Sequence, residues 1–144
     1  MIVVADSSGL IAALNVSDPE HSAAAKALDS AGYVIISPLA LAEIDYVVTA
    51  RASRWAADQV LDKVRARVQA GRATLAGVDA RVFGTALSVR RRYEGLRLGL
   101  ADAVNVALAA DHRTITILTL DRRDFRAVRP LTGQAAFRLL PDDR

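Results

Sequence analysis

Short apolar runs alternate with helix-like segments along the whole chain, and this alternation limits the choice of fold more than any other feature. Three runs of about four residues read as buried strands, at Ile2–Ala5, Tyr33–Ile36 and Thr116–Thr119. Two weaker runs, Ala73–Leu75 and Phe137–Leu139, predict a short strand and an edge strand. Because strands that alternate with helices form parallel sheets covered on both faces, we expect an α/β fold. Its architecture would be a three-layer α/β/α sandwich with a mostly parallel central sheet.

Residues that favour helix starts and stops divide the rest of the chain into helices. Asp18 and Pro19 suit the cap and the first position of one helix, and Ser37–Pro38 suit the start of the next. The expected helices cover residues 19–29, 39–52, 54–69, 80–93 and 100–112. In the helix over 54–69 one stripe of apolar side chains predicts the buried face, namely Trp55, Val60, Leu61, Val64 and Val68.

The length and composition favour one ordinary globular domain. The chain has 144 residues without repeats or a linker, which predicts a single domain over residues 1–144. It has no cysteine, which excludes disulfides, Cys–zinc sites and thiol nucleophiles. No apolar stretch reaches the ~20 residues of a membrane span, and Met1–Ala5 lacks a basic leader. We therefore expect a cytoplasmic protein with no membrane partner.

Four carboxylates stand in apolar surroundings. Asp6 directly follows the first strand, and Asp121 comes two residues after the Thr119 end of another. Because parallel strands finish at the same edge of a sheet, where open α/β folds place their ligands, Asp6 and Asp121 are expected to be neighbours. Glu43 and Asp102 lie in apolar helices with no basic residue three or four positions away. A carboxylate against a core needs a partner, so these two require one from elsewhere in the fold.

A bound divalent cation would satisfy all four acids, because carboxylates that converge without a cation repel one another. Oxygen ligands favour Mg²⁺ or Mn²⁺ over zinc, since the chain has no cysteine and only His21 and His112 as histidines. Each acid also has an ordinary structural interpretation. Asp6 or Asp121 can cap a turn, Glu43 can pair with a distant arginine, and Asp102 can complement a helix dipole. The four together, in these positions, favour the metal site.

The segments that carry these acids resemble, in order, the four motifs of PIN domains. They are Val4–Ser8 followed by Leu10–Leu14, then Leu39–Glu43, Leu100–Ala109 and Thr119–Phe125. The resemblance continues into Val128–Pro130 and Phe137–Pro141. The compact length is similar to that of the VapC toxins of VapBC toxin–antitoxin pairs.

The resemblance implies a metal-dependent endoribonuclease that hydrolyses RNA and acts as the toxin of a type II toxin–antitoxin system. It implies a VapB-type antitoxin as inhibitor and a homodimer as the usual assembly. The acidic site that it implies consists of Asp6, Glu43, Asp102 and Asp121 around Mg²⁺, with Mn²⁺ as a substitute. Ser7 or Thr119 would support the site by hydrogen bonds, and Asp124 would be an outer ligand. The Ser7–Ser8 pair departs from the usual residues after the first acid, which leaves the hydroxyl partner open.

Arginines are the expected contacts to RNA. They make up 17 of the 19 basic residues, and the formal net charge is +3. Arginine binds phosphate in a bidentate manner, although a GC-rich genome produces the same excess. Arg122 and Arg123 stand beside Asp121, and Arg90–Arg92 with Arg97 form a second basic stretch. Both clusters can also be solvated helix faces or contacts to an acidic antitoxin tail.

Three other kinds of protein compete with this interpretation. A phosphatase of the haloacid dehalogenase type needs a second acid two residues after its nucleophilic Asp, and Ser8 stands there after Asp6. A receiver-like signalling domain needs a lysine near its acidic pocket, and Lys26 and Lys63 are poorly placed for that. A non-catalytic RNA-binding module would be expected to lack one of the four acids, and all four are present.

Overall fold

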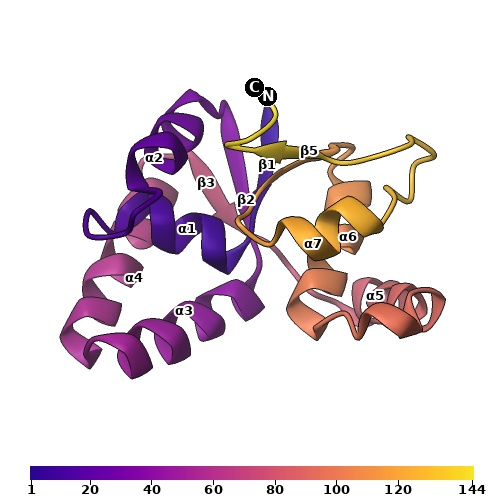
Figure 1. Ribbon diagram of the computed structural model, residues 1–144, viewed down its shortest axis with the longest axis horizontal. Coiled ribbons are helices and arrows are strands. Elements are labelled where there is room, and N and C mark those ends of the chain that lie inside the picture. Colours follow the sequence, from indigo (N-terminus) through magenta and orange to yellow (C-terminus); the bar gives the residue numbers. More distant parts are fainter.

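A five-stranded sheet runs through the middle of the molecule, with every strand parallel to its neighbours and the order β3-β2-β1-β4-β5 (Figure 1). The computed structural model describes residues 1–144. The strands are β1 (Ile2–Ala5), β2 (Tyr33–Ile36), β3 (Ala73–Leu75), β4 (Thr116–Leu118) and β5 (Arg138–Leu140). The predicted α/β fold is confirmed, and the sheet is wholly rather than mostly parallel.

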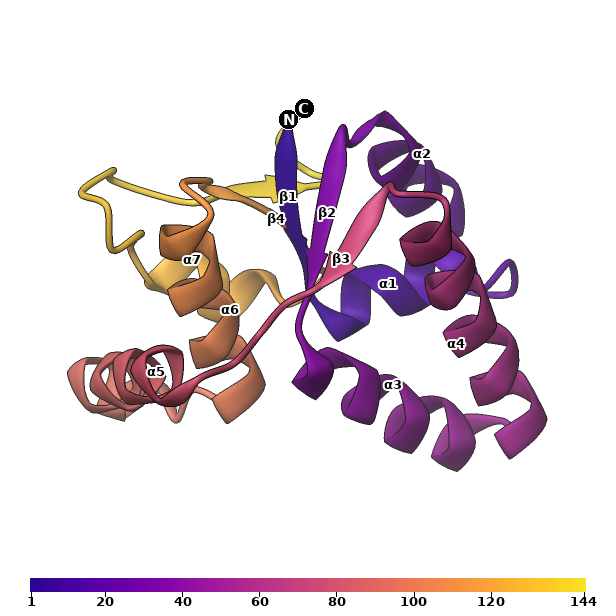
Figure 2. The same ribbon diagram turned by 180° about the vertical axis from the view of Figure 1, so that it is seen from behind.

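Helices cover both faces of this sheet and complete the predicted three layers (Figure 2). One group is α1 (Ser7–Leu14), α2 (His21–Ser30), α3 (Pro38–Arg51) and α4 (Arg54–Gln69). The other group is α5 (Ala80–Arg92), the 3-10 turn η1 (Glu94–Leu96), α6 (Leu100–Asp111) and α7 (Arg122–Ala127). None of the helices combines the length and the apolar character that crossing a membrane requires.

Each face of the sheet has its own hydrophobic core. Val3 and Ala5 point toward α1–α4, whereas Val4 between them points toward α5–α7. Ile35 and Ile117 join Val4 on the second face. Successive side chains of a strand alternate between faces, so a strand buried on both faces needs an unbroken apolar run. This double burial explains why the central strands could be located from sequence.

The sheet changes its direction of growth between β1 and β4. From β1 the chain adds β2 and β3 on one side, then crosses back and adds β4 and β5 on the other. Ala5 and Leu118 are paired in register, and the Asp6 N–H donates to the Leu118 carbonyl at 2.9 Å. Asp6 and Thr119 therefore leave the sheet side by side, at the switch point where open α/β folds bind ligands.

Helix α1, which sequence reasoning did not predict as a helix, packs directly against this switch point. All of its residues from Gly9 to Leu14 are buried. A Cβ atom at Gly9 would lie 2.4 Å from the Leu118 carbonyl oxygen, so only glycine permits this approach. An element buried on all sides lacks the apolar stripe that identifies a surface helix, which is why it was missed.

Two local predictions were wrong. Helix α2 begins at His21 rather than at Pro19, because the Asp18 carboxylate accepts the Glu20 N–H at 2.8 Å and stabilises a turn instead of capping the helix. Trp55 is 72% exposed, although Val60 and Val64 of the same predicted stripe are buried. Trp55 lies in the first turn of α4, at the end of the α3–α4 hairpin far from the sheet (Figure 2).

We predict that Gly9→Ala lowers the free energy of unfolding by about 1–3 kcal/mol, because the new methyl group meets the β4 backbone. The matched control is Gly84→Ala in α5, where an added Cβ meets nothing within 4 Å. This control should stabilise the protein by about 0.5–1 kcal/mol through helix propensity. Urea denaturation of both variants measures the difference, and equal effects at the two sites would contradict the packing of α1.

Candidate active site

Asp6 is the buried centre of the candidate site. It directly follows β1 and caps α1, and it is only 3% exposed. Its Oδ1 accepts the Ser7 N–H at 2.8 Å, while its Oδ2 accepts the hydroxyls of Thr119 at 2.8 Å and Ser8 at 3.0 Å. Burial raises the pKa of Asp6, and the three hydrogen bonds oppose that rise. The carboxylate is therefore held in one orientation.

Two hydroxyls connect this carboxylate to the segment after β4. Thr119 Oγ1 accepts the Asp121 N–H, and Ser8 Oγ accepts the Leu120 N–H, both at 2.9 Å. Thr119 thus hydrogen-bonds to Asp6, and its role in supporting catalysis stays a prediction. The supporting role of Ser8 was not predicted from the sequence. Helix α1 determines which of the two serine side chains faces Asp6, and this helix was not predicted.

Glu43 stands on α3 at the rim of the site. The side chain is exposed rather than buried, which corrects the sequence-based expectation. The buried face of α3 consists of Ala40, Ile44 and Val48, and Glu43 does not lie on it. Its Oε1 accepts the Ser7 hydroxyl at 3.0 Å. Ser7 therefore supports Glu43 through its side chain and Asp6 through its backbone. The charge of Glu43 is close enough to contribute to the raised pKa of Asp6.

Asp102 brings the third acid to the same place from the first turn of α6. Burial, followed by the charges of Asp6 and Asp121, raises the pKa of Asp102 to about 8. Glu43 contributes in the same direction. No lysine or arginine forms an ion pair with Asp102. The four acids predicted from sequence thus meet at one site without a cationic side chain to offset their charge.

Asp121 and Asp124 complete the acidic cluster on α7. Carboxylate oxygens of Asp102, Asp121 and Asp124 lie within 4.8 Å of one another. Asp121 caps α7 by accepting the Asp124 N–H at 3.4 Å. Asp124 Oδ1 is shielded from solvent and has no hydrogen-bond partner, and burial raises the pKa of this carboxyl group. Asp124 therefore belongs to the same cluster of carboxylates as Asp102 and Asp121.

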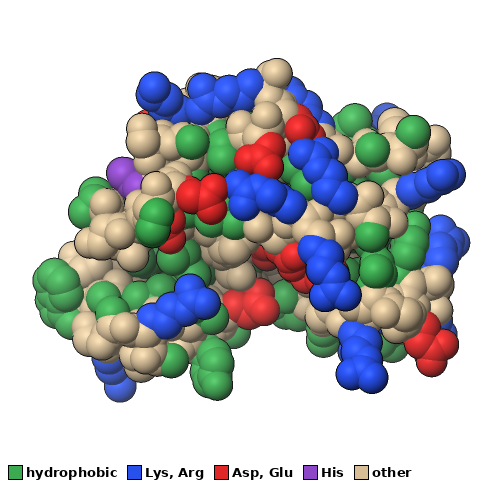
Figure 3. All heavy atoms as spheres, in the orientation of Figure 1, with side chains coloured by type: hydrophobic (Ala, Val, Ile, Leu, Met, Phe, Trp, Pro, Cys, Tyr) green, Lys and Arg blue, Asp and Glu red, His purple; other side chains and the backbone are tan.

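This donor set fits a divalent cation. All of the converging groups are hard oxygen ligands, and one buried oxygen, on Asp124, has no partner within the protein. Asn105, one turn after Asp102 on α6, is also buried with both polar side-chain atoms unpaired. In the space-filling view acidic side chains gather in the middle of one face, and lysine or arginine side chains surround them (Figure 3).

The two arginines beside Asp121 differ in their surroundings. Arg122 forms ion pairs with Asp142 at 2.6 Å and with Glu20 at 2.7 Å, so its charge is offset within the protein. Arg123 is exposed, and its charge partly opposes the rise in the pKa of Asp124. Arg122 connects α7 to the C-terminal segment and to the start of α2, while Arg123 remains open to solvent. Their predicted role in RNA binding stays a prediction.

Comparison with known proteins identifies the fold family. Residues 3–130 match the PIN domain family. The chain belongs to the PIN domain family. This PIN domain is 39% identical to Ribonuclease VapC26 of Mycobacterium tuberculosis over 140 residues, which cover 96% of the chain and 100% of the relative.

Solved structures support the same fold. The VapC20 toxin of M. tuberculosis, described as cleaving the sarcin–ricin loop, superposes on this PIN domain with a TM-score of 0.72 at 18% identity. That match covers 85% of this chain and 92% of the toxin. VapBC2 of Rickettsia felis, bound to a promoter DNA fragment, gives a TM-score of 0.66 at 20% identity. It covers 91% of this chain and 96% of the other.

We predict that Thr119→Val weakens divalent-cation binding by roughly 10–100-fold, because Asp6 loses a hydrogen bond that orients it. Valine keeps the shape of threonine but not the hydroxyl. Thr119→Ser restores the hydroxyl and should recover most of the affinity. Isothermal titration with Mn²⁺ measures all three proteins, and unchanged affinity in Thr119→Val would argue against this supporting role.

We predict that the metal-free protein loses stability as the pH rises from about 4 to 8. Folded Asp102 keeps its proton up to about pH 8, whereas an unfolded aspartate loses it near 3.8, so the folded state binds more protons in this window. The full shift corresponds to roughly 6 kcal/mol, and the partial solvent exposure of the group reduces the effect to about half of that. Asp102→Asn should therefore be about 3 kcal/mol more stable than wild type at pH 8 and nearly equal to it at pH 4.

Chemical denaturation in EDTA across this pH range measures the effect, with exposed Asp58→Asn on α4 as the control. Adding Mg²⁺ at pH 8 should stabilise the wild type and leave Asp102→Asn almost unchanged. A constant difference between Asp102→Asn and wild type at all pH values would show that Asp102 is not held protonated by its surroundings.

Proposed function

We propose that this PIN domain is a metal-dependent endoribonuclease and the toxin of a type II toxin–antitoxin pair of the VapBC kind. The observation that carries the proposal is the convergence of Asp6, Glu43, Asp102 and Asp121 at the switch point of the sheet, with their charges unbalanced. The 39% identity to a protein named Ribonuclease VapC26 supports RNA as the substrate class.

The proposed cofactor is Mg²⁺, with Mn²⁺ as a substitute, because both ions prefer oxygen ligands and octahedral geometry. Asp6 and Asp102 would be the principal ligands, and Asp121 and Glu43 would complete the shell directly or through water. Asp124 joins this set as a ligand close to Asp102 and Asp121. A divalent cation at this site would make a coordinated water more acidic and offset negative charge on the phosphate.

The side chains around the ion have separate tasks in this mechanism. Thr119 and Ser8 fix the orientation of Asp6. Glu43 or Asp121 accepts the proton of the attacking water, and Ser7 orients Glu43 for that step. The water would attack phosphorus in line with the leaving oxygen. As the new P–O bond forms, the bond to the leaving oxygen would break, and that oxygen would take up a proton from solvent.

A VapB-type antitoxin is the proposed protein partner. Three large hydrophobic side chains project into solvent from the α1–α4 side of the molecule, with Val16 73%, Tyr46 77% and Trp55 72% exposed. Hydrophobic side chains gather over α3 and α4 in the space-filling view (Figure 3). Surface of this kind is typical of a protein-binding site. The family resemblance adds a homodimer and a cytoplasmic location to the proposal.

We predict that the double variant Asp6→Asn/Asp102→Asn cleaves RNA at least ~100-fold more slowly than wild type in Mg²⁺, because both principal ligands lose their charge. The control Asp58→Asn/Asp62→Asn removes the same charge from the exposed face of α4 and should retain activity. A fluorogenic RNA oligonucleotide reports the rates, and EDTA should abolish cleavage by the wild type.

Expression in a bacterial host tests the biological part of the proposal. Induction should stop growth for the wild type but not for the double variant, and co-expression of the protein encoded just upstream should relieve the arrest. Cleavage by the double variant at the wild-type rate would exclude this site. Growth arrest that the upstream protein leaves unchanged would argue against the toxin–antitoxin assignment.

A further inference from the structure

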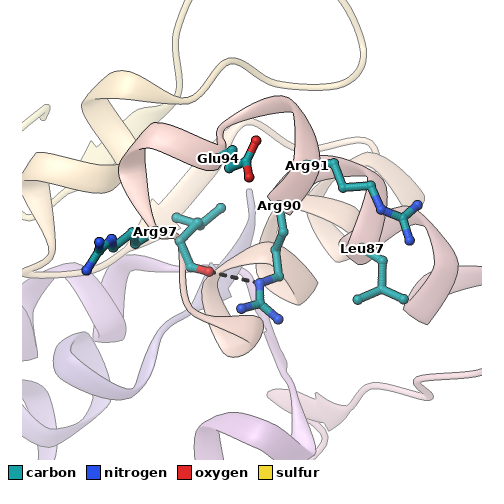
Figure 4. Close-up of a pocket in the computed structure, with 6 residues that line it drawn as sticks. Leu87, Arg90, Arg91, Glu94 and Arg97 are labelled. Carbon is teal, nitrogen blue, oxygen red and sulfur yellow. Dashed lines mark hydrogen bonds between the residues drawn. The ribbon is translucent and has the colours of Figure 1, made fainter.

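A hollow of about 420 Å³ lies between the last turn of α5, the turn η1 and the segment that enters α6 (Figure 4). It is separate from the acidic cluster and shares no residue with it. Three arginines and one acid line it above two leucines, namely Arg90, Arg91, Arg97, Glu94, Leu87 and Leu98. In Figure 4 Arg97 and Arg91 stand on opposite sides of Arg90, and Glu94 lies above it.

The arginines of this hollow carry uncompensated positive charge. None of Arg90, Arg91 and Arg97 forms an ion pair with a carboxylate. By contrast, five other arginines form ion pairs with Asp or Glu, namely Arg65, Arg67, Arg81, Arg122 and Arg126. Arg81 and Arg126 each bind an aspartate through two hydrogen bonds of 2.6–2.9 Å. The hollow is thus lined by three arginines that have no carboxylate partner within the protein.

One of the three arginines, Arg90, is held by a hydrogen bond to the backbone, and a second, Arg97, has an unusual backbone conformation. Arg90 Nε donates to the Leu98 carbonyl at 3.1 Å, which fixes the plane of the guanidinium and leaves its terminal nitrogens unbonded. Arg97 follows η1 with a φ of 52°, in the left-handed region that non-glycine residues seldom adopt. Conformations of this kind gather at ligand-binding segments. An anion entering the hollow would meet one guanidinium group, that of Arg90, that is already oriented.

The hollow adjoins the acidic cluster through a single stretch of chain. Leu98 lines the hollow, Gly99 caps α6, and Asp102 follows in the first turn of that helix. The three steps from Gly99 to Asp102 correspond to a rise of only about 4.5 Å along the helix axis. The hollow thus lies close along the chain to one acid of the cluster, as a substrate that contacts both would require.

We propose that this hollow binds the ribose–phosphate backbone of the RNA substrate beside the bond that is cut, which rests on the endoribonuclease activity proposed above. Arg90, Arg91 and Arg97 contact phosphate oxygens, for which the planar guanidinium is well suited. Glu94 accepts a hydrogen bond from a 2′-hydroxyl, the group by which proteins distinguish RNA from DNA.

The mixed lining favours RNA over an acidic peptide of the antitoxin. A peptide rich in carboxylates presents acceptors alone at its charged side chains, and Glu94 would repel them. A ribonucleotide presents both anionic phosphates and hydroxyl donors, so it matches the three arginines and the carboxylate at once. In this proposal the contacts to RNA phosphates come from arginines between α5 and α6. Arg122 on α7 forms ion pairs with Glu20 and Asp142 instead.

The test compares RNA binding by Arg91→Ala/Arg97→Ala with a charge-matched control, Lys26→Ala/Arg65→Ala, on exposed positions of α2 and α4. All proteins carry Asp6→Asn, so that a labelled single-stranded RNA stays intact in Mg²⁺. The arginine pair should weaken binding by about 10-fold or more. It should also flatten the dependence of log K on log salt by roughly 0.7 for each phosphate that the variant no longer neutralises. The control should change neither quantity beyond a general charge effect.

A second variant, Glu94→Ala, tests the ribose contact. The preference for RNA over DNA of the same sequence should fall, whereas the salt dependence stays as in the parent. Thermal melting checks that each variant folds, which is expected because Arg91, Glu94 and Arg97 are exposed.

The outcomes separate this proposal from the proposed function. If Arg91→Ala/Arg97→Ala binds RNA like the control, the hollow is not a substrate site, even when the parent enzyme cleaves RNA. If RNA binding is unchanged but neutralisation by the antitoxin is abolished, the hollow binds the inhibitor and the proposal is wrong. If the wild type fails to cleave any RNA, the enzyme assignment fails, while the binding measurement still decides whether the hollow holds RNA.

Discussion

Carboxylates repel one another at the switch point of the sheet, and the rest of the structure must offset the stability that this repulsion costs. Asp6 is almost fully buried, and burial together with the charges of Asp6 and Asp121 raises the pKa of Asp102 to about 8. Such a cluster costs stability in the metal-free protein. The fold compensates with two hydrophobic cores, one on each face of the sheet. A site of this kind stores free energy that cation binding releases, which is how binding and stability become coupled.

The strands position the acids, and the contacts between α1 and β4 hold them there. Gly9 lets α1 approach the Leu118 carbonyl, and this approach places Ser8 between Asp6 and the segment after β4. Asp6 thus receives hydroxyls from two elements that are 111 residues apart, as the contact between Ser8 and Thr119 shows. Removing any one of these hydrogen bonds would allow the carboxylate to rotate, so the precision of the site depends on packing as much as on its ligands.

The sequence predicted the structure best where burial on both faces of a strand requires an unbroken run of apolar residues. The central strands were located to within a residue because both of their faces are buried, and the four acids were found because each stands near the start or end of such a strand or inside an apolar helix. Helix α1 was not predicted, because a helix buried on all sides shows no stripe, and α7 has only six residues. The roles of Ser8 and Gly9 depend on α1 and were missed with it. The exposure of Glu43 and Trp55 depends on where the α3–α4 hairpin leaves the core, which no local pattern indicates.

The placement of the arginines follows from the same electrostatic constraint. An arginine next to Asp121 would be drawn into the acidic cluster and would compete there with a cation. Arg122 stands at that position, and its ion pairs with Glu20 and Asp142 draw it away from the cluster. Arg90, Arg91 and Arg97, which form no ion pair, line the hollow that ends at Leu98, just before α6 begins. Positive charge is thereby kept near the cluster without neutralising it, so that a cation and a polyanion can bind side by side.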